Sequence, residues 1–225
     1  MTKDLPVHLG FIVDGNRRWA RAKNLPTLEG HRRGFKQVEM VAEKIINLGV
    51  KYASFYLFST ENWNRSKEEV SYLMDLLRSQ IQRLVNKLKK KDIRILFLGT
   101  EKNAPEDIID KLHDAEMATQ DCKRGTVCVC FNYGGQQEIA DAANAAAKQG
   151  EVTVESINNN LYHPAVPPCD MIVRTSGEER ISGFMLWRAA YSEFLFLDKN
   201  FPDITGEDLP MILENYAHRQ RRFGH

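Results

Sequence analysis

Short apolar runs alternate with longer amphipathic segments along the chain. The apolar runs predict strands at residues 7–13, 52–58, 93–98, 127–131, 170–174 and 194–197. The longer segments carry apolar residues at helical spacing and predict helices over residues 16–23, 30–48, 67–91, 105–119, 136–148 and 207–219. Continuous apolar strands are typical of strands that are buried on both faces. We therefore expect an α/β fold, with a mainly parallel six-stranded sheet flanked by helices in a single domain over residues 1–225.

Polar, turn-forming residues follow four of the predicted strands directly. They occupy residues 14–18, 59–62, 132–135 and 174–177. In open parallel sheets, ligands bind beyond the carboxyl ends of the strands. The fold itself requires turns at the ends of the strands. It does not require carboxylate, amide and arginine side chains to gather there. The pattern therefore predicts a functional site at this edge.

The segment after the first strand combines a carboxylate with arginines. Asp14 follows the strand directly, and Gly15 allows a tight backbone approach. A short helix from Asn16 would offer free amides to an anion. Asp14 beside Arg17 and Arg18 is compatible with a simple ion pair. It is also the arrangement of a Mg²⁺ ligand next to a bound diphosphate, since hard cations prefer oxygen ligands.

The segment after the fifth strand adds two arginines, Arg174 and Arg180, with Ser182 close behind them. The planar guanidinium fork suits phosphate oxygens, although one arginine alone fits a solvated loop equally well. The chain has no Walker-type phosphate loop, no Gly-x-Gly-x-x-Gly fingerprint and no aspartate-rich Asp-Asp-x-x-Asp pair. Ordinary nucleotide-binding folds are therefore disfavoured.

The composition is that of a globular protein able to bury a core. Of its 225 residues, 43% are hydrophobic and 27% are charged, and the net charge of +1 gives no reason to expect nucleic-acid binding. The four cysteines form no Cys-x-x-Cys pair, so we expect buried structural thiols in a reducing cytosol. Residues 1–6 lack the basic start and apolar stretch typical of a signal peptide, and no apolar run approaches the ~20 residues that span a bilayer. A cytoplasmic enzyme is the natural expectation.

Taken together, the motifs resemble those of the cis-prenyltransferases, the family that includes undecaprenyl diphosphate synthases. The resemblance covers nearly the whole chain. The motifs stand in the family's order: Asp14-Gly15-Asn16-Arg17-Arg18-Trp19, Gly30-His31, Phe58-Ser59-Thr60-Glu61-Asn62-Trp63-x-Arg65, Asn132-Tyr133-Gly134-Gly135, Arg174-Thr175-x-Gly177-Glu178-x-Arg180-x-Ser182 and Trp187-x-x-x-Tyr191-x-Glu193.

The resemblance implies an enzyme that joins isopentenyl diphosphate to an allylic prenyl diphosphate with formation of a cis double bond. It implies Mg²⁺ as cofactor, held by Asp14 and Glu193, with Asp14 and Asn62 as catalytic residues. Mg²⁺ and arginines would stabilise the charge on the departing diphosphate while the isopentenyl double bond attacks the allylic carbon. The proton acceptor stays open between a phosphate oxygen and a group such as Asp14.

The same resemblance implies which residues bind the two substrates. They are Gly15, Asn16, Arg17, Arg18, Trp19, His31, Phe58, Ser59, Glu61, Trp63, Arg65, Arg174, Arg180, Ser182, Arg222 and Gly224. It also implies a homodimer, in which Arg222-Phe223-Gly224 reaches the partner's active site. A frayed basic tail is the alternative interpretation of this segment. A long prenyl product would make peripheral contact with a membrane plausible.

The predicted helix 67–91 carries an apolar stripe of Val70, Leu73, Met74, Leu77, Ile81, Leu84, Val85 and Leu88. Ordinary core packing explains most of the stripe, and in the resembling family a helix here also walls an apolar product tunnel. Leu57 stands where many long-chain members carry alanine. Because the larger side chain would crowd the tunnel, we expect a product shorter than undecaprenyl.

Three positions depart from the family pattern. Thr27 replaces a usual arginine four residues before His31, and Arg32 or Arg33 could supply the missing charge. Ser176 replaces a usual glycine, and Gln136 a usual arginine.

Two other functions compete with this interpretation. The first is a non-catalytic partner subunit of the same family, which would be expected to lack the Asp14 constellation. The second is a phosphate hydrolase, for which His31 and His8 have no obvious Ser or Cys partner in the sequence.

Overall fold

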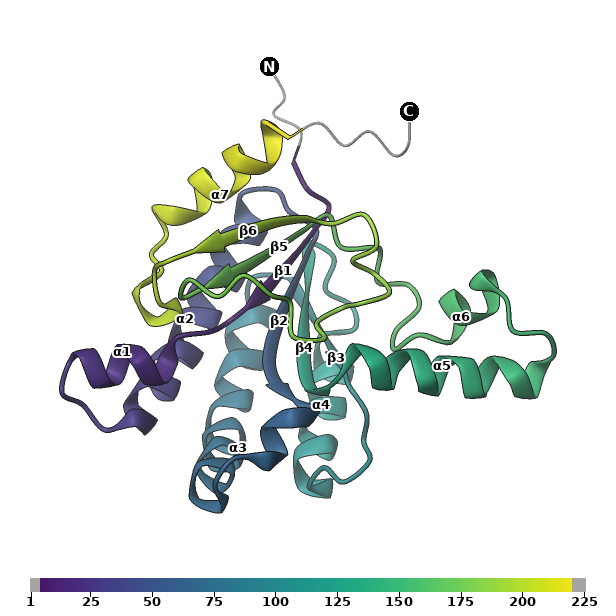
Figure 1. Cartoon of the computed structure of the whole chain (residues 1–225), viewed down its shortest axis with the longest axis horizontal. Helices are drawn as coiled ribbons and strands as arrows, with labels where there is room; N and C mark the ends of the chain where they lie inside the picture. Colours follow the sequence, from purple (N-terminus) through teal and green to yellow (C-terminus); the bar gives the residue numbers. More distant parts are fainter. Residues whose placement is uncertain (1–4, 220–225) are drawn as a thin grey trace.

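The computed structural model describes residues 5–219. Its six strands form one sheet in the order β3-β4-β2-β1-β5-β6, and every neighbouring pair is parallel. The strands are β1 (His8–Ile12), β2 (Tyr52–Ser59), β3 (Ile93–Leu98), β4 (Gly125–Tyr133), β5 (Met171–Thr175) and β6 (Glu193–Leu197). They lie close together near the N-terminal end of β1 and fan out toward their carboxyl ends (Figure 1). The α/β class and the parallel six-stranded sheet expected from the sequence are confirmed.

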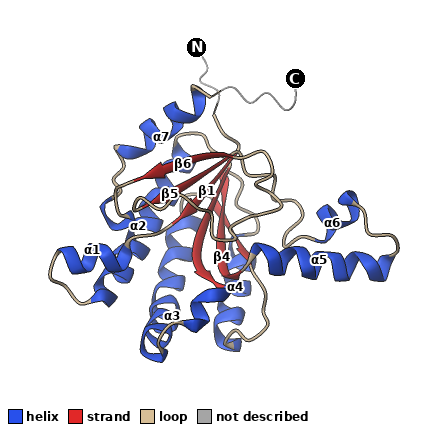
Figure 2. Cartoon of the chain, in the orientation of Figure 1, coloured by secondary structure: helices blue, strands red, loops and turns tan. Residues whose placement is uncertain are grey.

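Between residues 5 and 219 the chain also forms seven α-helices and two 3-10 helices, of which η2 and α7 follow the last strand. The α-helices are α1 (Asn16–Ala22), α2 (Thr27–Asn47), α3 (Lys67–Lys89), α4 (Glu106–Thr119), α5 (Gly135–Gln149), α6 (Val154–Asn160) and α7 (Asp208–Ala217), and the 3-10 helices are η1 (Thr60–Asn64) and η2 (Phe201–Asp203). Within residues 5–219, none of these helices combines the length and apolar content needed to cross a membrane. α5 and α6 project from the body of the molecule at one side, and α1 at the other (Figure 2).

The two faces of the sheet are covered differently. Helices α2, α3, α4 and α7 pack on one face through buried residues such as Val41, Leu84, Ile108 and Ile212. The opposite face is covered mainly by irregular segments between residues 161 and 189, where Phe184 is fully buried. Because no helical layer formed by the described residues covers this second face, the loops that follow β5 lie directly over the strands and approach the carboxyl edge of the sheet.

The helix boundaries have recognisable local causes. α3 begins after Ser66, whose hydroxyl accepts a hydrogen bond from the Glu69 backbone amide. α2 begins at Thr27, directly after Pro26, which is three residues earlier than the periodicity predicts. α6 was not predicted, since its seven residues bury no side chain and it is fixed mainly by a capping box between Thr153 and Ser156.

Candidate active site

Two adjoining clefts lie at the carboxyl ends of β1, β2 and β5. The first, of about 180 Å³, is lined by Ile12, Val13, Asp14, Asn16, His31, Tyr56, Leu57, Ser59, Asn62, Arg65, Leu73, Arg174 and Ser182. The second, of about 310 Å³, shares Val13, Asp14, Asn16, His31 and Arg65 with the first and adds Gly15, Arg17, Arg18 and Arg21. The structure therefore brings together most of the residues that the sequence singled out, with Asp14 on the wall common to both clefts.

Asp14 is held by groups from its own segment and from β5. Its Oδ2 accepts hydrogen bonds from Arg174 Nη2 at 2.9 Å and Arg18 Nη2 at 3.4 Å, and its Oδ1 accepts one from the Gly15 amide at 2.6 Å. Partial burial would raise the pKa of this carboxyl. The hydrogen bonds from Arg174 and Gly15 outweigh that effect, and the pKa lies below its usual range. Asp14 is therefore ionised at neutral pH.

Glycines determine how α1 reaches the cleft. Gly15 has φ of +96°, in the left-handed region that favours glycine, and it turns the chain from β1 into α1. A methyl group on Gly34 of α2 would lie 2.2 Å from Asn16 Oδ1, so the two helices cross in close contact at this point. The Asn16 side chain is thereby fixed at the cleft, where its Oδ1 is buried without a hydrogen-bond partner.

Arg174 connects Asp14 to the loop that follows β5. Its Nη1 donates to Ser182 Oγ at 2.9 Å and to the Arg180 carbonyl. The guanidinium is only 6% exposed, and its Nε is buried without a partner. Ser182 has φ of +48°, so the loop turns back over the end of β5 through a left-handed residue. Arg174 is thus rigidly placed between the carboxylate and the loop.

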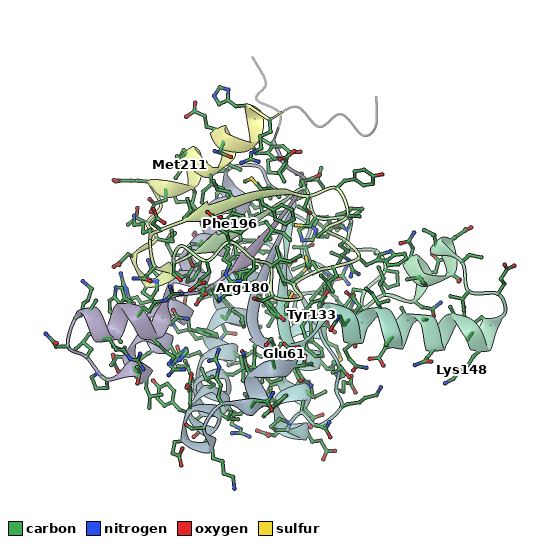
Figure 3. All side chains as sticks on the ribbon, in the orientation of Figure 1. Glu61, Tyr133, Lys148, Arg180, Phe196 and Met211 are labelled. Carbon is green, nitrogen blue, oxygen red and sulfur yellow. The ribbon has the colours of Figure 1, made fainter. Side chains whose placement is uncertain are left out.

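Arg180 is far more exposed than Arg174, at 61% of its side chain. Glu178 lies between two arginines, 2.6 Å from Arg180 and 3.1 Å from Arg18. Ser176 has φ of +74°, which agrees with the glycine usual at this position, and its hydroxyl is buried without a partner. Because Arg180 of this loop and Arg18 of α1 are both well exposed, they can exchange Glu178 for an anion without breaking the core. Arg180 is labelled in Figure 3, as is Glu61 of η1, which follows β2.

The turn after β2 is fixed by a reciprocal pair. The Ser59 amide donates to Asn62 Oδ1 at 3.1 Å, and the Ser59 side chain in turn accepts from the backbone of Asn62, forming a capping box at the start of η1. Both side chains line the first cleft. Glu61 accepts a hydrogen bond from the Thr60 hydroxyl and does not line either cleft.

The predicted aromatic residues lie around the cleft rather than on its polar wall. Trp63 donates from Nε1 to Asn132 Oδ1 at 2.7 Å and packs edge-on against Phe58, with ring centroids 4.8 Å apart. Phe58 lines a small apolar cavity that adjoins the cleft. Trp19 points away from both clefts and donates to Asp203 Oδ1 at 2.7 Å. Its position favours a role in fixing α1 rather than in touching substrate.

A carboxylate that the sequence analysis did not single out, Glu69, contacts several of the predicted residues. It lies 2.9 Å from Arg65, 3.3 Å from His31 and 3.4 Å from Arg17. Burial and the charge of Arg65 lower the pKa of His31, although Glu69 opposes them, so His31 is neutral near pH 7. The only sequence signal for Glu69 is its spacing of four residues from Arg65.

Within one chain, Asp14 and Glu193 do not meet, so the expectation that they share one metal ion stays a prediction that would need a second copy of the chain. Glu193 begins β6 and pairs in register with Met171 at the start of β5, whereas Asp14 follows the end of β1. The two carboxylates therefore lie at opposite edges of the sheet, and Glu193 forms an ion pair with Arg219 at 2.8 Å. In residues 5–219 no three His, Cys, Asp or Glu side chains gather to hold a metal.

The arginines on α2 that were expected to replace the charge missing at Thr27 lie away from the clefts. Arg32 is bound to Glu29 on the surface, and neither it nor Arg33 lines a cleft, so neither supplies the charge missing at Thr27. Arg17 and Arg21 of α1 line the second cleft instead. Arg222 and Gly224 lie outside the described residues.

Comparisons with known proteins agree with this geometry. A family model described as putative undecaprenyl diphosphate synthase matches residues 12–224. The chain is 42% identical to an isoprenyl transferase of Thermotoga maritima, over 98% of this chain and 97% of that one. It is 41% identical to a decaprenyl diphosphate synthase of Mycobacterium tuberculosis, over 98% of this chain and 77% of that one.

Two solved structures share the fold over 98% of this chain and 99% of their own. One is lavandulyl diphosphate synthase from Lavandula x intermedia in complex with dimethylallyl diphosphate, at 30% identity and a TM-score of 0.94. The other is a probable undecaprenyl diphosphate synthase from Campylobacter jejuni, at 27% identity and a TM-score of 0.84.

Proposed function

The chain belongs to the cis-prenyltransferases, the family of the undecaprenyl diphosphate synthases, and we propose that it condenses isopentenyl diphosphate with an allylic diphosphate in the two adjoining clefts. The observation that carries this proposal is the position of Asp14. Its carboxylate lies on the wall shared by two clefts that are lined by Arg17, Arg18, Arg65 and Arg174. Two anionic head groups side by side, with one carboxylate between them, suit this arrangement.

We propose that the second cleft holds the allylic diphosphate. Asn16, Arg17, Arg18 and His31 line it, and they provide amide, guanidinium and imidazole donors for phosphate oxygens. The apolar tail would point through the first cleft toward Leu57 and Leu73, which line both that cleft and the adjoining apolar cavity. Ser59 and Asn62 lie along this path and would face the reacting carbon.

The isopentenyl diphosphate would bind at the loop after β5. Arg174 and Ser182 line the first cleft. The exposed Arg180 can turn from Glu178 to a phosphate oxygen. Arg174 also contacts Asp14, so the two head groups would be held in register on either side of one ion pair. Such positioning supplies a large part of the rate gain of a two-substrate reaction.

The residues around Asp14 fit a magnesium ion. Asp14 Oδ1 takes one hydrogen bond, from the Gly15 amide, and the carboxylate is 31% exposed to the cleft. Mg²⁺ is commonly bound by one or two carboxylates together with substrate phosphates and water, which this site can offer once a diphosphate is present. The ion would neutralise charge on the departing diphosphate.

A homodimer would give Glu193 a role that a single chain denies it. Glu193 and Arg219, which form an ion pair, lie at the end of the sheet remote from Asp14, and Arg219 stands just before the C-terminal segment that carries Arg222 and Gly224. We propose that all three residues act toward the active site of a second copy. The Arg219–Glu193 pair would then mark the edge of the contact between the copies.

The space available to the product supports a short prenyl chain. The apolar cavity next to Leu57 measures about 40 Å³, room for only a few waters at ~10–15 Å³ each. Beyond it, Ile81, Leu84, Val85 and Leu88 of α3 fill the core. A long product would need α3 to move away from the sheet, so we propose a product shorter than undecaprenyl.

The direct test is incubation with magnesium, isopentenyl diphosphate and either dimethylallyl, geranyl or farnesyl diphosphate. Mass analysis should show elongated diphosphates, and NMR should show that each new double bond is cis. Release of inorganic diphosphate without consumption of isopentenyl diphosphate would indicate a hydrolase. The absence of both reactions, with binding of the substrates retained, would indicate a non-catalytic partner subunit.

A further inference from the structure

Two arginines and a histidine from three different elements meet at one carboxylate, that of Glu69. Arg17 comes from α1, His31 from α2 and Arg65 from the end of η1, while Glu69 lies in the first turn of α3. Glu69 Oε1 is 2.9 Å from Arg65 Nη1 and 3.3 Å from His31 Nε2, and Oε2 is 3.4 Å from Arg17 Nη1. Only the contact with Arg65 is a well-aligned hydrogen bond. The four side chains link the three helices at the mouth of the clefts.

Glu69 lies deeper than the arginines that it contacts. Its side chain is 14% exposed, compared with 47% for Arg17 and 31% for Arg65. Arg17, His31 and Arg65 all line the second cleft, whereas Glu69 lines neither cleft. The arginines therefore stand between the carboxylate and the space in which an anion would bind. Glu69 supports the cleft wall from behind and does not compete for the ligand's position.

A carboxylate is needed at this point for a physical reason. Arg17 and Arg65 carry like charges, and without a counter-ion their flexible side chains would repel one another and swing into solvent. Binding an anion would then require that they be ordered again, which reduces affinity. α1 has only seven residues, and its contact with α2 at Gly34 does not fix its long side chains. Glu69 adds the missing connection, from α1 to α3.

We propose that Glu69 is a positioning residue, which orders Arg17, His31 and Arg65 before the substrate arrives and so strengthens binding of the allylic diphosphate. The assignment to the allylic substrate rests on the proposed function of the second cleft. The ordering of the three side chains does not, because it concerns any diphosphate that this cleft takes. Glu69 itself touches neither substrate.

The test compares Glu69→Gln with Glu68→Gln, a matched control that removes the same charge one residue away, on the exposed side of α3. Affinity for inorganic diphosphate is measured by calorimetry, and Michaelis constants are measured for both substrates. We expect Glu69→Gln to weaken the binding of inorganic diphosphate and to raise the Michaelis constant for the allylic substrate by about tenfold. The Michaelis constant for isopentenyl diphosphate should change less than twofold. A general loss of structure would instead raise both constants and lower the melting temperature. The control should match the wild type.

Several outcomes would overturn the inference: equal behaviour of the two variants, equal increases in both Michaelis constants, or tighter diphosphate binding by Glu69→Gln. Should Glu69→Gln not fold, Glu69→Asp provides the same comparison, since it retains the charge but withdraws it from Arg17 and Arg65. Failure of the proposed function is distinguishable, because the wild type would then bind inorganic diphosphate without condensing the two substrates. In that case the calorimetric comparison still decides the role of Glu69.

Discussion

Arg174 Nη2 lies 2.9 Å from Asp14 Oδ2 and joins the ends of two neighbouring parallel strands, β5 and β1. The pair is reinforced by the Thr175 hydroxyl, which donates to the Asp14 carbonyl at 2.7 Å. Arg174 is almost fully buried, so the carboxylate is held in one place before any ligand binds. A fixed carboxylate can direct an ion or a diphosphate without reorganising when the reaction begins.

We therefore expect Asp14→Ala to lower kcat by at least about a hundredfold, the scale on which removal of one preorganised electrostatic group acts. The fold should persist, since Arg174 keeps its hydrogen bonds to Ser182 and to the Arg180 carbonyl. Steady-state kinetics and a thermal melt measure the two effects. Chelation of divalent ions should abolish wild-type turnover, and full activity of Asp14→Ala would contradict the proposed site.

Thr27 offers a test of how the second cleft obtains its charge. It is the first residue of α2 and stands one helical turn before His31, on the same side of the helix. We expect Arg17→Ala to raise the Michaelis constant of the allylic substrate roughly tenfold or more, since hydrogen bonds to charged groups contribute about 1.5–3 kcal/mol. Thr27→Arg should lower the constant in the wild type and restore much of the loss in the Arg17→Ala background. If Thr27→Arg leaves both backgrounds unchanged, Thr27 lies outside the site.

Leu57 and Leu73 together separate the polar cleft from the apolar cavity. We expect Leu57→Ala to lengthen the product by at least one prenyl unit, because it joins the two spaces and removes the side chain that narrows the passage. Mass analysis of products from one starter measures the change. Leu76→Ala is the matched control, since Leu76 lies on α3 but lines neither space. Identical products from the wild type and Leu57→Ala would refute the role of Leu57.

Sequence reasoning found the residues that follow strands and was weaker on those that lie in helices. Asp14 and Arg174 each come directly after an apolar run, so the switch-point rule alone placed them at one edge. Glu69 was missed because its neighbours come from α1, α2 and η1, and only the packing of those elements shows that they meet. No local pattern contains that information.

The separation of Glu193 from Asp14 within one chain escapes sequence reasoning for a different reason. The role of Glu193 came from a family motif, and a motif does not state at which end of a strand a residue lies. The apolar run 194–197 begins just after Glu193, which already indicated the edge opposite Asp14. For Thr27, two nearby arginines on α2 were expected to compensate, but helical geometry turns Arg32 and Arg33 away from His31 and onto the surface. In both cases the direction of the element, rather than the residue type, determined the outcome.

The pH dependence of stability should depend strongly on His8, which is fully buried in β1. Its Nδ1 lies 2.9 Å from the Pro167 carbonyl and its Nε2 lies 2.7 Å from the Ser54 hydroxyl. Burial lowers the pKa of His8 to about 4, although the hydrogen bond to Pro167 opposes this effect. In the unfolded chain the pKa returns to an ordinary value near 6.5. Between these two pKa values the unfolded state binds one more proton than the native state, so stability rises with pH in this window.

The expected change in the free energy of unfolding follows from the same two pKa values. The contribution of His8 to the free energy of unfolding should fall by about 2 kcal/mol between pH 7 and pH 5, since each pKa unit corresponds to about 1.36 kcal/mol. Urea unfolding at both pH values measures it, with His8→Gln as the variant and His113→Gln, at an exposed position of α4, as the control. His8→Gln should be less stable at pH 7, because Ser54 and Pro167 lose their fitted partner, but its stability should depend less on pH. If the wild type and His8→Gln lose the same free energy between pH 7 and pH 5, His8 does not remain neutral in the folded protein.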